Sequence, residues 1–254
     1  MNKIKERKLD NPPIKDVVLA ITFDSLFDEN NTVNLYANEV QNKTGFNKVN
    51  TMGSFQVHID AKTGMQEVKS IENAFLQSRD KKQSFSIELN KLWYSDKSKY
   101  KNFDNFYRKI DKIYSMLNVN KNFEVREIGL KYVNSFCLPL NLLDRHFEIL
   151  PIFNNQSKDG NYYSLVKKYS NNINVVSSKF EKVGAYVSIY YTATLNADIK
   201  IDFIIDTYYK SLGEVKTFSE IYQKCSILRE FKNEIFYGNI FHIDEIKEFH
   251  NASK

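Results

Sequence analysis

Residues 174–208 decide the fold class, and they read NVVSSKFEKVGAYVSIYYTATLNADIKIDFIIDTY. Three stretches dominated by β-branched and aromatic residues follow one another here, with only short turns around Val183-Gly184 and Asn196-Ala197 between them. Strands this close along a chain pair antiparallel. The stretch therefore predicts an antiparallel meander, with strands at Asn174–Glu181, Ala185–Thr194 and Asp198–Tyr208.

Apolar and polar residues alternate in the same way elsewhere in the chain, as they do in strands that have one buried face. In the last strand of the meander, Ile201, Phe203 and Ile205 share the face that we expect to be buried. Toward the N-terminus, the same alternation predicts further strands at Val17–Asp24, Ser54–Asp60, Met65–Ser70, Gln83–Tyr94 and Phe123–Phe136.

Two segments show the spacing of three and four residues that is typical of amphipathic helices. The clearer one is Asn102–Asn118, where Asn102 suits the N-cap position. A shorter helix is expected at Asn31–Gln41, with an inward face formed by Leu35, Tyr36 and Val40.

The C-terminal third is predicted to be helical. Thr217 and Glu220 have the spacing of a capping box, which marks a helix start, and a short final helix is expected at Asp244–Asn251. Strands therefore precede a helix twice along the chain. This order predicts the α+β class, with antiparallel sheet packed by long amphipathic helices in two successive strands-then-helix halves. We expect a single domain over 1–254, with pseudo-halves at about 1–120 and 121–254.

Composition excludes several classes of protein. The 254 residues are 42% hydrophobic and 26% charged, as in globular proteins, and the net charge is +5 with a pI near 8.9. Thirty of the 36 basic residues are Lys, beside 28 Asn, as an AT-rich coding bias produces, so the charge is weak evidence for nucleic acid. The charged N-terminus predicts no signal peptide, and no apolar run reaches membrane-spanning length. We expect a cytoplasmic protein with Cys137 and Cys225 reduced and buried.

No motif for a known chemistry occurs. The chain has eight Gly, and none forms a phosphate-binding loop; its four His are scattered without metal-ligand spacing. The sequence therefore predicts no catalytic residue, no cofactor and no metal.

Four charged residues form a candidate polar cluster. Arg126 and Glu127 interrupt the apolar pattern of a predicted strand, and one of them should point toward the packed side. An Arg in that position needs a partner, so we expect a semi-buried ion pair with Asp202 or Asp206. A ligand-binding Arg126 stays open as the alternative.

Paired tyrosines mark a candidate interface. Neighbouring strand residues face opposite sides, so one residue each of Tyr190-Tyr191 and Tyr208-Tyr209 must leave the inward face. Ile204 lies on that same outer face between Asp202 and Asp206. The predicted interface comprises Tyr190, Tyr191, Ile204, Tyr208 and Tyr209. The alternative is that another layer of the same chain covers it.

The chain carries a series of short motifs, in this order: Asn11–Ile14, Tyr100 with Phe103 and Phe106, Arg126 with Ile128–Asn134, Ile201–Asp206, Leu228 with Asn233–Phe236, and Asp244–Phe249. In the same order they resemble motifs of a sporadically distributed family of bacterial proteins of about this length, whose function is not known. The resemblance covers nearly the whole chain, but each motif is short, and it implies a single domain without supplying catalytic residues. The family's patchy distribution in bacteria resembles that of genes on mobile islands, including phage-defence systems.

These observations favour a non-enzymatic recognition module that binds a protein partner or a second copy of itself, with no membrane. Two alternatives stay open. One is a nucleic-acid-binding or processing component with weak nonspecific affinity, and the other is an enzyme that uses Arg126, Asp202 and Asp206.

Overall fold

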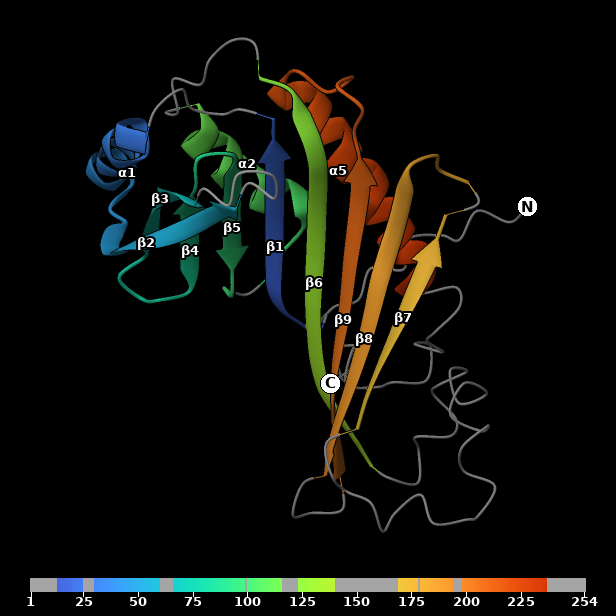
Figure 1. The fold of residues 1–254 in the computed structure, drawn as a ribbon. Coiled ribbons are helices and arrows are strands. Elements are labelled where there is room, and N and C mark those ends of the chain that lie inside the picture. The colour runs from blue at the N-terminus through green and yellow to red at the C-terminus, as the bar shows by residue number, and fades with distance from the viewer. Residues whose placement is uncertain are drawn as a thin grey trace. The chain divides into compact units, whose positions relative to one another are not determined.

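The computed structural model describes residues 13–24, 30–59, 66–98, 100–115, 123–139, 169–177, 179–193 and 198–236 (Figure 1). It confirms the α+β class with antiparallel sheet. The chain divides into two compact units. The first unit comprises Val17–Gly129 with Tyr209–Lys224, and the second comprises Met1–Asp16, Leu130–Tyr208 and Cys225–Lys254. The single domain expected over 1–254 stays a prediction.

The described part of the chain has the following strands and helices. The strands are β1 (Ile14–Phe23), β2 (Asn47–Ile59), β3 (Gln66–Gln77), β4 (Gln83–Ile87), β5 (Lys91–Asp96), β6 (Val125–Pro139), β7 (Tyr169–Val176), β8 (Val183–Ala193) and β9 (Asp198–Lys210). The helices are α1 (Asn30–Thr44), α2 (Phe103–Tyr114) and α5 (Phe218–Glu234).

In the first unit the strand order is β2-β3-β4-β5-β1-β6. Helix α2 packs its apolar stripe on this sheet, and the rings of Tyr94 on β5 and Phe106 on α2 lie 5.6 Å apart. Asn102 caps the helix as predicted, because its side chain accepts a hydrogen bond from the Asn105 amide at 2.8 Å. The buried stripe comprises Phe103, Phe106, Tyr107, Ile110, Ile113 and Tyr114.

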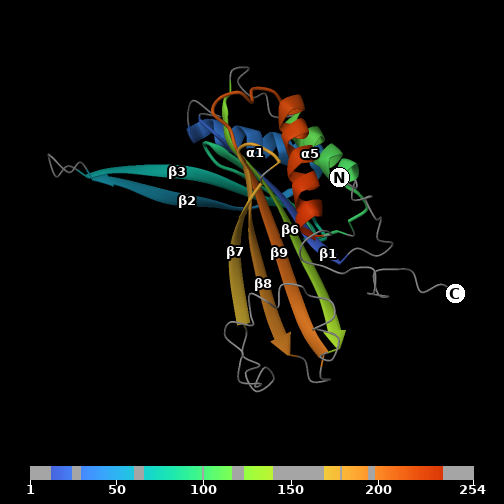
Figure 2. The same ribbon diagram turned by 90° about the vertical axis from the view of Figure 1, so that its right-hand side faces the viewer.

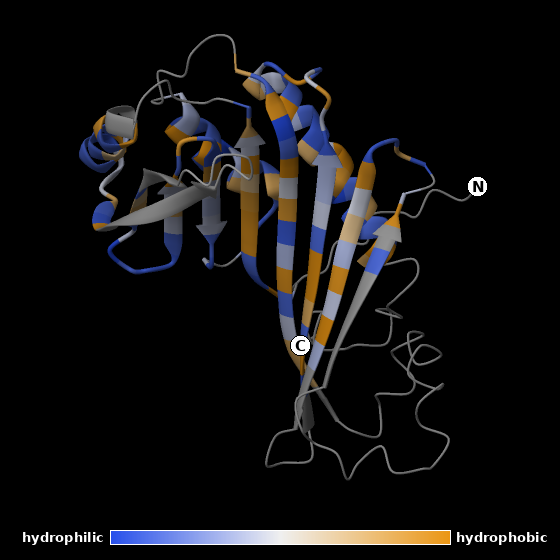
Figure 3. Cartoon of the chain, in the orientation of Figure 1, coloured by the Kyte–Doolittle hydropathy of each residue, from blue (hydrophilic) through white to orange (hydrophobic). Residues whose placement is uncertain are grey.

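In the second unit the strand order is β6-β9-β8-β7. Ile201, Phe203 and Ile205 are fully buried, which confirms the inward face predicted for the last strand of the meander. The residues that follow α5 pack on this side: the Phe236 ring lies 6.0 Å from that of Phe203. Along β8 and β9 apolar and polar bands alternate in the hydropathy colouring (Figure 3), as strands with one buried face require.

Two buried side chains tie β6 to β9. The Asn134 amide donates to the Phe203 carbonyl at 3.1 Å, and the Thr207 hydroxyl donates to the Leu130 carbonyl at 2.8 Å. Asn134 is 2% exposed and Thr207 is fully buried. These bonds satisfy polar groups inside the core and fix how the two strands are aligned.

The capping box of the C-terminal helix is confirmed. The Glu220 carboxylate accepts the Thr217 amide at 2.9 Å, and the Glu220 amide donates to the Thr217 hydroxyl at 3.2 Å. The Lys216 amide donates to the same carboxylate, and these bonds hold the pKa of Glu220 below its usual value. The helix predicted at Asp244–Asn251 lies outside the described residues.

Strand boundaries differ from the sequence prediction at two turns. The strand expected over Gln83–Tyr94 is two strands, because the Glu88 amide donates to the Lys91 carbonyl and closes a turn. The first meander strand ends at Val176 instead of Glu181. There the Ser177 hydroxyl accepts the amides of Lys179 and Phe180, which is a side-chain turn that short polar residues favour.

Two burial predictions are wrong. Helix α1 buries Val40 as expected, but Leu35 is 68% exposed, since the helix turns Val33, Ala37 and Val40 to the core. Cys225 is buried, which raises the pKa of its thiol, whereas Cys137 is exposed near the end of β6.

Neighbouring residues on β9 give a test of the two faces. Phe203→Ala should lower the free energy of unfolding by about 3–5 kcal/mol, since it opens a cavity in the core. Ile204→Ala should cost less than about half of that, because Ile204 is only half-buried. Urea denaturation of both variants measures the difference, and equal losses would mean that both faces of β9 are packed.

Candidate functional site

The chain around Arg126 departs from the regular strand pattern. Val125 and Ile128 are both buried, whereas Arg126 and Glu127 between them are both exposed. The alternation of buried and exposed residues is therefore shifted by one position at the start of β6. Such a shift occurs where a strand carries one extra residue relative to its neighbour. The expectation that one of these two charged residues points toward the packed side is wrong for this reason.

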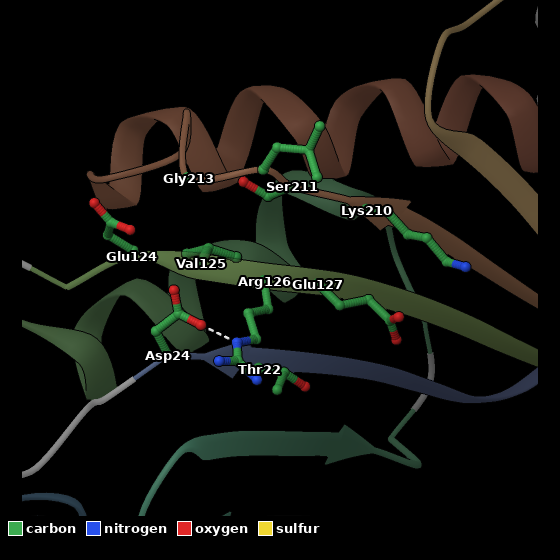
Figure 4. A pocket seen from close by; sticks show the side chains of 10 residues that line it. Thr22, Asp24, Glu124, Val125, Arg126, Glu127, Lys210, Ser211 and Gly213 are labelled. Carbon is green, nitrogen blue, oxygen red and sulfur yellow. Dashed lines mark hydrogen bonds and ion pairs between the residues drawn. The ribbon is translucent and has the colours of Figure 1, made fainter.

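Arg126 pairs with a residue that the sequence did not indicate. Its guanidinium Nε donates to the Asp24 carboxylate at the end of β1 (Figure 4). The Arg126 side chain is 67% exposed and that of Asp24 is 42% exposed. The semi-buried ion pair with Asp202 or Asp206 is therefore wrong. No local sequence pattern indicates Asp24 as the partner of Arg126, because the contact depends on β1 and β6 lying side by side.

This ion pair lies in a cleft of about 540 Å³ within the first unit. Backbone bonds hold its walls together: the Asp24 amide donates to the Glu124 carbonyl at 2.9 Å, and the Ser211 amide donates to the Arg126 carbonyl at 2.8 Å. The residues that line it are Thr22, Asp24, Glu124, Val125, Arg126, Glu127, Lys210, Ser211, Leu212 and Gly213.

A tight turn forms one wall of the cleft. The Glu214 carboxylate accepts the Tyr209 hydroxyl at 2.6 Å and the Leu212 amide at 2.5 Å. Gly213 has a φ of +88°, which side chains rarely tolerate, and thereby lets the chain turn back after β9. Tyr209 is only 5% exposed, so its assignment to the predicted outer interface is wrong.

The cleft combines carboxylates and cations that are already paired. Besides Arg126 with Asp24, the Lys216 ammonium lies 3.2 Å from the Glu124 carboxylate. Water reaches these groups, so their charges are screened and each pair contributes little. The arrangement can donate and accept hydrogen bonds to a polar ligand. Among the described residues no group of His, Cys, Asp and Glu is placed to hold a metal ion.

Asp202 and Asp206 belong to the second unit, whereas Arg126 and Glu127 belong to the first. Asp202 pairs with Lys200 at 3.0 Å, and Asp206 pairs with Lys131 at 2.9 Å. Asp202 and Asp206 thus each have a lysine of their own unit as a partner.

The outer face of β8 and β9 in the second unit carries aromatic residues. Tyr186 on β8 is 52% exposed, and its ring lies 5.2 Å from that of Tyr208 on β9. Tyr190, Ile204 and Tyr208 are half-buried. We call Tyr186, Tyr190, Ile204 and Tyr208 the Tyr186 face. The side chain of Tyr191 lies outside the described residues.

Tyr208 lies close over a glycine. A Cβ atom at Gly184 would lie 2.3 Å from the Tyr208 hydroxyl oxygen and 2.5 Å from its Cζ atom. Any side chain at this position would push the Tyr208 ring away. Gly184 was predicted only as a turn residue, but it shapes the aromatic surface.

The sequence reasoning missed Tyr186 and the exposed Val176, which is 72% accessible at the end of β7. The signal was available for Tyr186, because Ala185, Val187 and Ile189 alternate with it and are fully buried.

A comparison of the chain with models of known protein families and with curated proteins finds no match. The family resemblance described above therefore stays an expectation. Over the described residues no helix is long and apolar enough to cross a membrane.

Replacement of Arg126 tests how the cleft contributes to stability. Arg126→Ala should change the free energy of unfolding by no more than about 1 kcal/mol, because the ion pair that it removes is exposed to water. Arg126→Lys is the matched control that keeps the charge. Chemical denaturation measures both, and a loss of about 3 kcal/mol or more would mean that the pair is buried.

Proposed function

We propose that this protein is a non-enzymatic recognition module that binds a protein partner through the Tyr186 face. The observation that carries the proposal is the exposed Tyr186 ring against Tyr208, with half-buried Ile204 on the same side of the meander. Tyrosine suits interfaces, since its ring can be buried while its hydroxyl stays hydrogen-bonded.

Charged residues border this aromatic surface in the way that a polar rim borders an interface. One pair, Lys200 with Asp202, lies on β9. The other joins Asp206 on β9 to Lys131 on the neighbouring strand β6. Each pair is partly exposed, so it can exchange partners with charges on another protein at little cost.

The same ion pairs weigh against the nucleic-acid alternative. Lys131 and Lys200 already face carboxylates, and Lys179 lies 2.6 Å from Glu230 and 2.7 Å from Glu234. Those two carboxylates raise the pKa of Lys179 and also offset its positive charge. Lysines that lie beside carboxylates present little net positive charge to a phosphate backbone.

The enzyme alternative rests on the Arg126 cleft. Catalytic groups are typically desolvated, whereas the Arg126 side chain is two-thirds exposed and paired. Asp202 and Asp206 have lysine partners within the second unit. This support is weaker than that for binding. A cytoplasmic setting and a role in a mobile-island or phage-defence system remain part of the proposal.

Site-specific crosslinking in the native host tests the partner. A photoreactive amino acid at position 186 should crosslink to one defined protein, and the same amino acid at position 35 should not. Leu35 is the matched control, because it is also a large hydrophobic side chain and is 68% exposed on α1 of the first unit.

A charge on the face sharpens this test. Ile204→Lys should abolish the crosslink from position 186 while the melting temperature stays within a few degrees. Identical crosslinked products from positions 35 and 186, or a crosslink that survives Ile204→Lys, would contradict the proposal.

Binding to nucleic acid should be weak and independent of sequence. Gel shifts with DNA and RNA at about 150 mM salt should give dissociation constants no tighter than about 10⁻⁴–10⁻⁶ M. Nanomolar and sequence-dependent binding would instead make a nucleic-acid-binding component the leading function.

A further inference from the structure

One end of the sheet formed by β3, β4 and β5 carries cations without carboxylate partners. Arg79, Lys81 and Lys82 lie in the turn between β3 and β4, and Lys97 follows β5. The Lys97 amide donates to the Lys82 carbonyl at 2.7 Å, so the fourth cation lies beside that turn. All four side chains are exposed, and within the described part of the chain none of them forms an ion pair. We call these four residues the basic turn.

Two of these cations face each other across neighbouring strands. In the register of β4 and β5, Gln83 lies opposite Asp96, and the next pair along the same ladder is Lys82 with Lys97. Like charges directly opposite each other destabilise a sheet. A bound anion would remove this repulsion, so the arrangement favours an anionic ligand.

The carboxylate of the same turn does not neutralise it. Asp80 accepts the Ser78 hydroxyl at 2.7 Å and the Lys82 amide at 3.1 Å, and these bonds lower the pKa of Asp80, so it stays ionised. Four cations and one carboxylate leave the turn with a net charge of +3. The three paired lysines that weigh against nucleic acid belong to the second unit instead.

Lys81 occupies a backbone position that lysine does not favour. Its φ is +58°, in the left-handed region where Gly is favoured and Asn is the residue with a side chain that fits best. The chain has 28 Asn, so that residue type is common elsewhere in it. Residues in such strained conformations cluster at functional sites. A lysine here indicates that its charge matters more than the fit of the backbone.

An aromatic residue shares the outer face with the basic turn. Along β5, Leu92 and Tyr94 are fully buried, whereas Trp93 between them is half-buried. The buried side packs on helix α2, where the Tyr94 ring contacts that of Phe106. Figure 2 shows α2 on one side of the first unit, with β2 and β3 extending toward the other. Because side chains alternate along a strand, Lys97 lies on the Trp93 side, four residues further on.

Small side chains lie between the aromatic residue and the cations. Ser86 lies opposite Trp93, and Phe75 lies opposite Ser86 with its ring 6.5 Å from the Trp93 ring. The next outward pair toward the basic turn is Ser84 with Ser95. Both serines are small and buried, so no bulky side chain of β4 or β5 separates the Trp93 ring from the basic turn.

We propose that this face of the first unit binds single-stranded nucleic acid, with phosphates at the basic turn and a base stacked on the Trp93 ring. Proteins that bind single strands combine a positively charged track for the backbone with aromatic rings for the bases. A duplex keeps its bases paired inside and would leave the ring unused. Every base has a flat face, so the binding is tolerant of sequence.

Few phosphate contacts make this binding weak, in line with the range expected above for nucleic acid. Four cations correspond to a slope of about −3 when the logarithm of the affinity is plotted against that of the salt concentration, at about 0.7 per contact for single strands. The inference goes beyond the proposed function, because it uses other residues of the other unit. Binding of a protein partner at the Tyr186 face can hold or fail independently of it.

Titration of the full chain with an oligothymidylate of about 15 nucleotides tests the proposal. Trp93 is the only tryptophan, so its fluorescence reports a base that stacks on it. The fluorescence should be quenched saturably, with a dissociation constant of about 10⁻⁵ M at about 50 mM salt, and the affinity should fall about sevenfold when the salt is doubled. A duplex of the same length should quench much less.

Charge variants locate the phosphates. Lys82→Gln combined with Lys97→Gln should weaken binding at least about tenfold and reduce the salt slope by about 1.4. Lys43→Gln is the matched control, because it removes a lysine that is paired with Glu39 on α1 of the same unit, and it should change the affinity less than about twofold. Asp80→Asn keeps an acceptor oxygen but removes a negative charge, so it should tighten binding.

Two further substitutions separate binding from stability. Lys81→Gly should weaken binding while the melting temperature stays the same or rises, since glycine fits the left-handed position. Trp93→Phe keeps an aromatic ring and should retain most of the affinity, whereas Trp93→Leu should lose at least about fivefold, measured with a fluorescently labelled oligonucleotide.

Several results would overturn the proposal. They are a fluorescence that does not change up to about 10⁻⁴ M oligonucleotide, equal effects of the double lysine variant and Lys43→Gln, and a duplex that binds as tightly as the single strand. Polyglutamate that displaces the oligonucleotide at equal charge concentration would assign the face to an acidic protein segment instead. Vesicles containing phosphatidylserine that do so would assign it to a membrane surface.

Discussion

The buried hydrogen bonds between β6 and β9 set the two faces of the second unit. Asn134 and Thr207 each use a side-chain donor to reach a carbonyl of the opposite strand, at 3.1 Å and 2.8 Å. A slip of one residue would expose every inward side chain and would leave both donors without acceptors in the core. Because this alignment holds, Phe203 faces the core and Ile204 faces outward.

The neighbours of the outward side chains then decide which parts of this face are charged and which are apolar. Asp202 and Asp206 find lysines on β9 itself and on β6, which leaves the aromatic rings as the uncharged part of that surface. The hydroxyl end of the Tyr208 ring can lie this close to Gly184 only because no side chain is present there. Electrostatic pairing and a missing Cβ atom together make an apolar centre with a charged border.

Alternation along strands is local, so the sequence predicted it well. It identified the inward faces of Ile201, Phe203 and Ile205 and the apolar stripe of α2, and the caps at Asn102 and Thr217 were equally local. The failures have more than one cause. Arg126 was assigned to the wrong partner because its ion pair depends on β1 beside β6, and Tyr209 was misplaced because a carboxylate from the following turn holds it inside. The sequence predicted the Tyr186 face only in part, because it indicated Tyr190, Ile204 and Tyr208 but not Tyr186.

The connectivity of the two units has a consequence for how the protein is made and dissected. The first unit needs Tyr209–Lys224 to complete it, and the second draws on both ends of the chain. No single cut yields either unit as one continuous fragment. On the ribosome the first unit cannot close before Tyr209–Lys224 has been synthesised, so a chain that stops before this segment would lack part of both units.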